Sequence, residues 1–173
     1  MQQEFDYIII GGGSAGCVLA SRLSEDPNIS VCLLEAGGQG DSWTVNVPAA
    51  CVMSLPTKIN NWAFETVPQK GLNGRKGYQP RGKCLGGSSA INAMIYIRGH
   101  RADYDAWAAQ GNTGWSYEEV LPYFICSENN ERIQNEYHGN SGPLSVIDLR
   151  TDNPIHARYI AAAKSQGYRI LDD

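Results

Sequence analysis

Three glycines in a G-x-G-x-x-G pattern at positions 11–16 constrain the fold of this chain more than any other feature of its sequence. They follow an apolar run at residues 5–10, which is typical of a strand buried on both faces of a parallel sheet. They precede a segment at residues 14–24 whose apolar residues recur at helical spacing. A second apolar run at residues 30–35 completes a strand, a helix and a strand, so the sequence predicts one βαβ unit.

The order of these glycines has a physical explanation if the turn binds a dinucleotide. Gly11 permits the tight turn, Gly13 lets the backbone approach a pyrophosphate, and Gly16 lets the helix pack closely on the strand. The helix then begins at Ser14 and Ala15. Its N-terminus offers N–H groups and a partial positive charge to phosphates.

Glu35 closes the second predicted strand, 19 positions after Gly16, and Ala36 follows it. A carboxylate at this place can accept hydrogen bonds from the ribose hydroxyls of an adenosine. An acid instead of a basic residue argues against a 2′-phosphate and therefore against NADP. The pattern leaves NAD and FAD open, because both contain an ADP half. The competing interpretation is a glycine-rich turn with an incidental surface glutamate.

A second glycine-rich turn, GGSS at residues 86–89, lies within the segment 81–98. Its backbone amides can face an anion or a flat ring, with two hydroxyls beside them. The apolar run that follows, residues 90–97, is interrupted by a single amide, Asn92. A second site for a phosphate and a ring in one small chain favours a dinucleotide with a bulky second half over plain NAD.

The second turn and its surroundings resemble the first signature of the glucose–methanol–choline (GMC) oxidoreductases, G-K-x-L-G-G-S-S-x-I-N followed by an aromatic residue, a glycine and an acid. The matching residues are Gly82, Lys83, Leu85, Gly86, Gly87, Ser88, Ser89, Ile91, Asn92, Tyr96, Gly99 and Asp105. The segments DYIIIGGGSAGCVLASRLSED, LLEAGG, NWAFETVPQ and YIRGHRADYDAW are also similar to members that oxidise choline or other alcohols. The resemblance covers essentially all 173 residues.

The resemblance implies an α/β chain with a Rossmann-like FAD/NAD(P)-binding fold of the GMC type. We expect an incomplete FAD-binding domain at residues 1–140 and the beginning of a second, α+β substrate-binding domain at residues 141–173. A predicted strand at 143–149 and a helix at 153–166 are similar to the entry into that domain. One βαβ unit does not complete a doubly wound sheet, so the remainder of the polypeptide is expected to complete the fold.

Three further segments have local patterns that predict their structure. Residues 39–81 lack periodicity and contain many glycines, prolines and asparagines, and we interpret them as a segment that covers a ligand. A short helix is expected at residues 103–109. Ser116 and Glu119 form a capping box, which predicts a helix at residues 117–127 in spite of Pro122.

The resemblance implies a non-covalent FAD, because relatives that attach FAD covalently use a histidine at the position of Ile91. Trp62 either covers the cofactor or fills the core, and Arg81 and Lys83 either neutralise cofactor charge or are solvated. Ala93 is expected near the reactive N5 atom. The cofactor-binding residues predicted in this way are Gly11, Gly13, Ser14, Ala15, Gly16, Glu35, Ala36, Trp62, Arg81, Gly82, Gly86, Gly87, Ser88, Ser89, Asn92, Ala93, Met94 and Ile95.

By the same resemblance, the expected activity is oxidation of the CH–OH group of a small alcohol, choline or an aliphatic primary alcohol. Hydride passes to flavin N5, a histidine takes the hydroxyl proton, and electrons continue to a quinone or another acceptor. His100, His138 and His156 do not match the family's catalytic position, so no catalytic residue is expected in this chain. The alternatives are an oxygen-using alcohol oxidase of the same family, an NAD-dependent dehydrogenase, and a non-catalytic nucleotide-binding fragment.

Composition excludes several other classes of function. A net charge of −4 with scattered basic residues gives no footprint for nucleic acid. The five cysteines show no zinc spacing, so no metal site is expected, and their small, odd number favours a reducing compartment. The N-terminus lacks a basic region before a long apolar stretch. We therefore expect a cytoplasmic protein with at most peripheral membrane contact.

Overall fold

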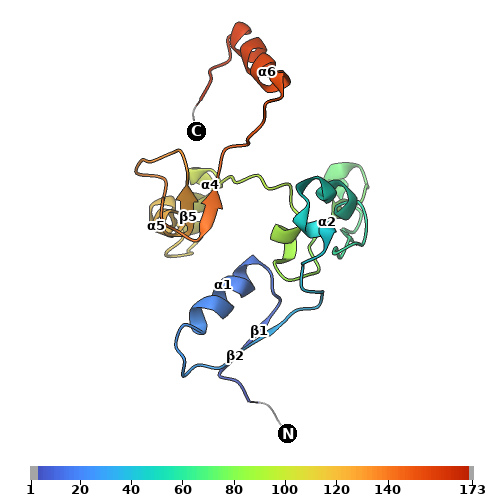
Figure 1. Cartoon of the computed structure of the whole chain (residues 1–173), viewed down its shortest axis with the longest axis vertical. Coiled ribbons are helices and arrows are strands. Elements are labelled where there is room, and N and C mark those ends of the chain that lie inside the picture. Colours follow the sequence, from blue (N-terminus) through green and yellow to red (C-terminus); the bar gives the residue numbers. More distant parts are fainter. Residues whose placement is uncertain (1–3, 172–173) are drawn as a thin grey trace. The chain divides into compact units, whose positions relative to one another are not determined.

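The computed structural model describes residues 4–171, which divide into two compact units at the boundary between Ile95 and Tyr96 (Figure 1). Among the described residues, the first unit contains a parallel and an antiparallel two-stranded sheet, and the second unit contains a parallel two-stranded sheet. The domain boundary predicted between residues 140 and 141 differs from this boundary between compact units, and it stays a prediction.

The first unit begins with the predicted βαβ unit. Strands β1 (Tyr7–Ile10) and β2 (Val31–Leu34) pair in parallel and are connected by helix α1 (Ser14–Leu23). Helix α1 starts at Ser14, inside the G-x-G-x-x-G pattern, so Gly16 lies in its first turn. A Cβ atom on Gly16 would lie 1.9 Å from the carbonyl oxygen of Gly11, so only glycine allows the helix to begin this close to the turn. The α/β prediction for this part of the chain is therefore confirmed.

The rest of the first unit consists of short elements without a long periodic pattern. Between β2 and the second glycine turn lie α2 (Trp43–Asn46), η1 (Pro48–Ala50), α3 (Cys51–Ser54), β3 (Phe64–Glu65), η2 (Lys70–Leu72) and β4 (Tyr78–Gln79). Strands β3 and β4 form an antiparallel pair. The second glycine turn itself forms a 3₁₀ helix, η3 (Gly87–Ala90).

The stretch at residues 81–86 connects these short elements to the βαβ unit. The amide of Trp62 donates to the carbonyl oxygen of Arg81 at 2.8 Å, and the amide of Lys83 donates to that of Asn60 at 2.7 Å. Farther along, the amide of Leu85 donates to the carbonyl oxygen of Gly38 at 2.9 Å. The segment predicted to cover a ligand is thus fixed by backbone hydrogen bonds to the stretch that follows it.

The second unit contains α4 (Arg101–Ala109), α5 (Tyr117–Ser127), β5 (Glu128–Asn130), β6 (Leu144–Val146) and α6 (Pro154–Ser165), with β5 and β6 paired in parallel. The predicted capping box is present: Ser116 and Glu119 exchange hydrogen bonds, and Pro122 lies inside α5. Helix α4 starts two residues earlier than expected, because the ring of His100 accepts a hydrogen bond from the amide of Ala102 and caps it. The strand expected at residues 143–149 is shorter, at Leu144–Val146.

Large apolar side chains are widely exposed in both units. On the first sheet, 60% of Ile8, 87% of Ile10 and 51% of Leu34 are accessible to solvent. The apolar residues buried among those described are Ala50, Cys84, Ile91 and Val120. Within residues 4–171, every helix is too short or too polar to cross a membrane.

Candidate functional site

The two glycine turns of the sequence line one groove of about 540 Å³ in the first unit. The first turn and the end of β2 contribute one wall, and the second turn contributes the other. The lining residues are Ile10, Gly11, Gly13, Leu34, Glu35, Ala36, Trp62, Gly82, Gly87 and Ser88. Eight of these ten were predicted from the sequence as cofactor-binding residues, and Ile10 and Leu34 were not.

Direct backbone contact holds the two turns together. The amide of Gly86 donates to the carbonyl oxygen of Gly12 at 2.7 Å, and Gly13 and Gly86 form a parallel bridge. A Cβ atom on Gly87 would lie 2.7 Å from the Cα atom of Gly13, closer than Cβ atoms approach in real proteins. Gly87 also has a φ of +56°, in the left-handed region that favours glycine. The contact between the turns therefore depends on glycine at position 87.

The N-terminus of α1 opens into this groove without a capping side chain. In the described structure, no side chain makes a capping hydrogen bond at the N-cap residue, Gly13, and the first turn of α1 contains no acidic residue. A Cβ atom built on Gly13 meets no protein atom within 4 Å, so this residue leaves open space beside the helix end. Such a helix end presents unpaired N–H groups and a partial positive charge, which suits the phosphates of a nucleotide.

Glu35 lies at the end of β2 with both carboxylate oxygens engaged by backbone amides. Oε2 accepts from the amide of Gly12 at 2.7 Å, and Oε1 accepts from the amide of Gly37 at 2.8 Å. Each oxygen retains a second lone-pair direction that can accept a hydroxyl. The carboxylate therefore supports the glycine turn and faces the groove at the same time, a structural role that the sequence did not reveal.

Trp62 forms part of the groove wall and contacts Phe64 and Lys83. Its ring is parallel to that of Phe64, with centroids 5.6 Å apart and planes 8° apart. The Nζ atom of Lys83 lies 4.3 Å from the Trp62 ring centroid, a cation–π geometry. Lys83 thus contacts the indole of Trp62, and its two expected roles, charge neutralisation and solvation, stay predictions.

Arg81 does not line the groove. Its guanidinium donates to the carbonyl oxygen of Pro80 at 2.6 Å and to Oε1 of Gln79 at 3.3 Å. The predicted role of its side chain in neutralising cofactor charge stays a prediction. Ser14, Ala15, Gly16, Gly86, Ala93 and Ile95 also lie outside the set of lining residues, although Gly16 and Gly86 shape the two turns.

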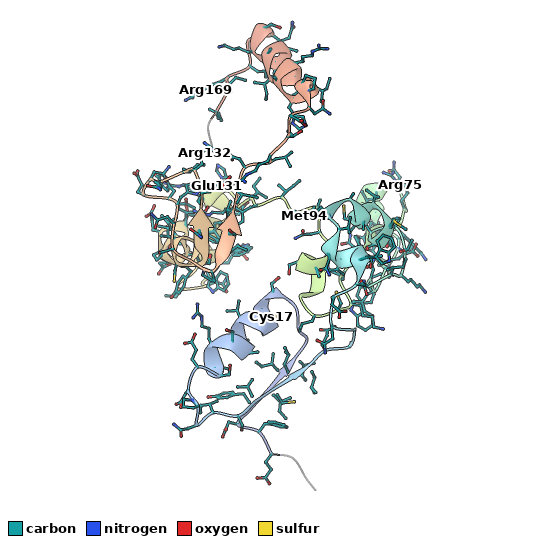
Figure 2. The ribbon with its side chains drawn as sticks, viewed as in Figure 1. Cys17, Arg75, Met94, Glu131, Arg132 and Arg169 are labelled. Carbon is teal, nitrogen blue, oxygen red and sulfur yellow. The ribbon has the colours of Figure 1, made fainter. Side chains whose placement is uncertain are left out.

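Ser89, Asn92 and Met94 line a second, smaller cleft of the same unit. Met94, labelled in Figure 2, has a φ of +58°, an uncommon conformation for a residue with a side chain. Its amide donates to Oδ1 of Asn92 at 2.8 Å, which stabilises this turn. Ile91 beside it is buried, with 3% of its surface exposed. The predicted flavin-facing segment thus contains a tight turn at residues 92–94.

Two cysteines lie close to the glycine turns. The Sγ of Cys17, labelled on α1 in Figure 2, donates to the carbonyl oxygen of Gly12 at 3.2 Å. Cys84 is fully buried, and burial together with the negative charge of Glu35 raises the pKa of its thiol. In the described part of the chain, no cluster of three or more His, Cys, Asp or Glu side chains is arranged to hold a metal ion.

The second unit contains a buried charge cluster that sequence reasoning missed. Glu128 is completely buried, and its carboxylate accepts hydrogen bonds from Arg98, from Nδ2 of Asn130 at 2.9 Å and from the amide of Gly139 at 3.3 Å. Nδ1 of His138 lies 2.9 Å and 3.1 Å from the two oxygens. Burial alone would raise the pKa of Glu128, but the hydrogen bonds from Asn130, His138 and Gly139 and the charge of His138 hold it below its ordinary value.

Each of the three histidines has a different environment. His100 caps α4, His138 contacts Glu128, and His156 lies in the first turn of α6. The prediction that none of them is the base of an alcohol oxidation stays a prediction.

Comparison with known proteins relates the whole chain to one family. The family model described as GMC oxidoreductase matches residues 5–173. The oxygen-dependent choline dehydrogenase of Vibrio vulnificus is 49% identical over 175 residues, which cover 100% of this chain and 31% of that protein. The alcohol dehydrogenase [acceptor] of Pseudomonas putida is 48% identical over 159 residues, which cover 91% of this chain and 29% of that protein.

Solved structures give the same result. The crystal structure of pyridoxine 4-oxidase from Mesorbium loti matches with a TM-score of 0.84 and 38% identity, covering 98% of this chain and 33% of that one. The chain thus spans about 30% of the length of the relatives that it matches.

Proposed function

This chain belongs to the GMC oxidoreductase family, whose members are flavoproteins, and we propose that its groove holds the FAD of an enzyme that oxidises alcohols. The observation that carries the proposal is the backbone contact between the two glycine turns. Gly86 donates to Gly12, and both turns line one groove with Glu35 at its end. A single elongated dinucleotide can therefore contact both turns at once.

The chemistry of the groove assigns a role to each wall. The open N-terminus of α1 beside Gly13 receives the pyrophosphate, because its N–H groups and helix dipole favour negative charge. The free lone pairs of Glu35 accept the ribose hydroxyls of the adenosine. The flavin end extends toward Ser89 and the turn at residues 92–95. Ile91 is apolar and buried, so the FAD is non-covalent at the position where some relatives use histidine.

For the complete enzyme we propose a primary alcohol, choline or an aliphatic alcohol, as the substrate. When bound, FAD would supply an acceptor for the hydride of the alcohol carbon, so that the alcohol would become an aldehyde once a base took its hydroxyl proton. The residues of this chain bind and orient the cofactor and supply no catalytic group. A quinone or another acceptor receives the electrons, and oxygen is the alternative, as the name of the Vibrio vulnificus relative suggests for that protein. A cytoplasmic location with at most peripheral membrane contact completes the proposal.

A pair of glycine substitutions tests the cofactor site. Gly13→Ala adds one methyl group in open space within the groove, where the pyrophosphate would lie, and it meets no protein atom within 4 Å. Gly71→Ala adds the same methyl group in open space on η2, away from the groove, and serves as the matched control. Both substitutions are made in a chimera in which this chain replaces the aligned N-terminal part of the Vibrio vulnificus choline dehydrogenase. Titration with FAD, followed by flavin fluorescence, should show at least tenfold weaker binding for Gly13→Ala only. Equal binding by the two variants, or no saturable binding by the parent chimera, would overturn the assignment.

The same chimera, in which this chain covers 31% of the relative, tests the proposed reaction. We expect the purified chimera to contain FAD whose visible absorbance is bleached by choline or an aliphatic alcohol under anaerobic conditions. A folded chimera without flavin would contradict the proposed function.

A further inference from the structure

The second unit has a surface hollow of about 400 Å³, here called the tryptophan hollow, which is lined by Trp107, Asn112 and Trp115. Trp107 lies on α4, and the other two residues lie in the loop that leads to α5. All three belong to the second unit, whereas the groove of the proposed cofactor site is lined by residues of the first. The tryptophan hollow is therefore a separate feature, and its ligand does not depend on the proposed function.

The two indoles of the hollow are held in place by aromatic contacts and are still half exposed. Their rings meet edge to face, with centroids 5.7 Å apart and planes 66° apart. Trp107 also meets Tyr104 edge to face, with centroids 5.6 Å apart. The exposed fractions are 46% for Trp107 and 51% for Trp115, so ring surface is open to a ligand. Two aromatic surfaces at an angle to each other thus line one hollow.

The third lining residue, Asn112, is fixed by the loop. Its Nδ2 atom donates to the carbonyl oxygen of Trp107 at 2.8 Å, which connects the loop to the last turn of α4. Gly111 and Gly114 have φ values of +95° and +87°, in the left-handed region that glycine adopts readily. The Oδ1 atom of Asn112 carries the negative end of the amide dipole and can approach a positive charge.

The sequence around the tryptophan hollow is acidic. Residues 102–119 contain no lysine, arginine or histidine, and their acids are Asp103, Asp105, Glu118 and Glu119. Arg101, just before them, has its guanidinium carbon 4.5 Å from the ring centroid of Tyr117 and its Nη2 atom 3.6 Å from Oε1 of Glu118. This segment therefore already stabilises one cation on an aromatic ring. Because its acids outnumber that one arginine, the local charge favours a further cation.

We propose that the tryptophan hollow binds a small alkylated ammonium ion, such as a trimethylammonium group. The ring face of an aromatic residue attracts a cation, and tryptophan gives the strongest contact of this kind. A fully alkylated nitrogen has no N–H group that needs an acceptor, and its methyl groups suit an apolar surface. A cavity of about 150 Å³ in another protein holds benzene, so the hollow has room for tetramethylammonium, which is smaller than benzene by one non-hydrogen atom.

Such a site should select for charge more than for size. Each cation–π contact at an exposed site improves affinity about two- to fivefold. Contact with both indoles should therefore favour tetramethylammonium over tert-butanol by about fivefold or more. The two molecules have the same number of non-hydrogen atoms and similar apolar area, so an apolar surface without a cation–π contact would bind them about equally.

Fluorine NMR of 5-fluorotryptophan tests the proposal at individual residues. The label is incorporated into the chimera with the Vibrio vulnificus choline dehydrogenase, and resonances are assigned by substituting each tryptophan of this chain with phenylalanine in turn. At constant ionic strength, tetramethylammonium should shift the Trp107 and Trp115 resonances saturably and leave that of Trp43, on α2, unchanged. The same shift should need at least fivefold more tert-butanol. Equal effects of the two molecules, or no saturable shift because the rest of the polypeptide covers the hollow, would overturn the inference.

Substitutions at position 115 separate a cation–π contact from apolar burial. Trp115→Leu keeps an apolar side chain without an aromatic face, and it should weaken tetramethylammonium binding, followed at the Trp107 resonance, at least twofold. Trp115→Phe retains a ring and should have intermediate affinity. Trp43→Leu, at a 60% exposed position of the first unit, is the matched control and should bind as the parent does. Circular dichroism of each variant confirms that it is folded. If folded Trp115→Leu bound the cation as tightly as the parent, the inference would be wrong.

Discussion

The amide of Gly86 donates a 2.7 Å hydrogen bond to the carbonyl oxygen of Gly12, so the two glycine turns of this chain meet backbone to backbone. No side chain separates them, because Gly13 and Gly87 face each other next to this bond. The groove between a βαβ unit and the short elements after it is therefore built on main-chain contact.

Gly87→Ala should break this contact. The added Cβ would lie 2.7 Å from the Cα of Gly13, and Gly87 has a φ of +56°. The left-handed conformation alone costs about 1–2 kcal/mol for a residue with a side chain, and the clash adds to it. We expect a lower urea midpoint together with weaker FAD binding. Gly38→Ala, which meets no atom within 4 Å, is the control and should change neither. A Gly87→Ala chain as stable as the parent would show that the turns do not touch in solution.

Glu35→Gln should weaken both the turn and the cofactor site. Glutamine has one acceptor oxygen, so one of the two amides, that of Gly12 or that of Gly37, would face an NH₂ group instead of an oxygen. Leaving such a donor without an acceptor costs about 1–3 kcal/mol in unfolding free energy. The measurement is urea unfolding with and without FAD. Glu25→Gln, which changes an exposed carboxylate paired with Arg22, is the matched control and should have little effect.

The βαβ unit could be predicted from the sequence because its determinants are local. The apolar runs, the glycine spacing and the acid at the end of β2 all lie within residues 5–35, and the structure places them as expected. The capping box before α5 is local as well. Eight lining residues of the groove followed from these motifs and from the resemblance to the family.

The parts that could not be predicted depend on contacts between distant residues. Asn61 uses its side-chain NH₂ to bind the carbonyl oxygens of Ser54 and Thr57 and its Oδ1 to accept from the amide of Arg81, and this organises the segment 39–81 without any periodic pattern. The cluster around Glu128 likewise combines residues between positions 98 and 139. The glycine after His138 was a sequence feature that could have indicated it. A Cβ on Gly139 would lie 1.9 Å from a backbone oxygen of Ile125, so the chain needs glycine there.

Protonation of Glu128 should destabilise the second unit at acid pH. The pKa of Glu128 is lowered in the folded chain, so its stabilising contribution is fully present above the ordinary value of 4.5 and is lost as pH falls through the folded value. Thermal unfolding between pH 7 and pH 3 should show this loss. In Glu128→Gln, the stability should still decline below pH 4.5, because Asp6 and Glu119 remain and their pKa values are also lowered. The decline should be shallower than in the parent chain, because the contribution of Glu128 is missing.

The same variant should be less stable at neutral pH. Removing one partner of a buried ion pair typically costs about 3–5 kcal/mol, because Arg98 keeps its charge in a site where its side chain is 13% exposed. Glu118→Gln changes an exposed partner of Arg101 and should be nearly neutral. If Glu128→Gln matched the parent at pH 7, the cluster would not contribute to folding.

Exposed apolar side chains on the first sheet should make the 173-residue chain self-associate or bind FAD weakly when it is produced alone. Ile8 is 60% exposed and lies on β1, outside the groove lining, while Val18 on α1 is 59% exposed. Exposed apolar surface drives association because its burial releases water. Ile8→Thr keeps a β-branched residue in the strand and removes apolar area, so sedimentation velocity should show a larger monomer fraction and dye binding should fall. Arg75→Thr, at an exposed polar position of the same unit, is the control and should leave both unchanged. A tightly flavin-bound, monodisperse parent chain would contradict this prediction, since it would show that the exposed faces of β1 and α1 need no partner.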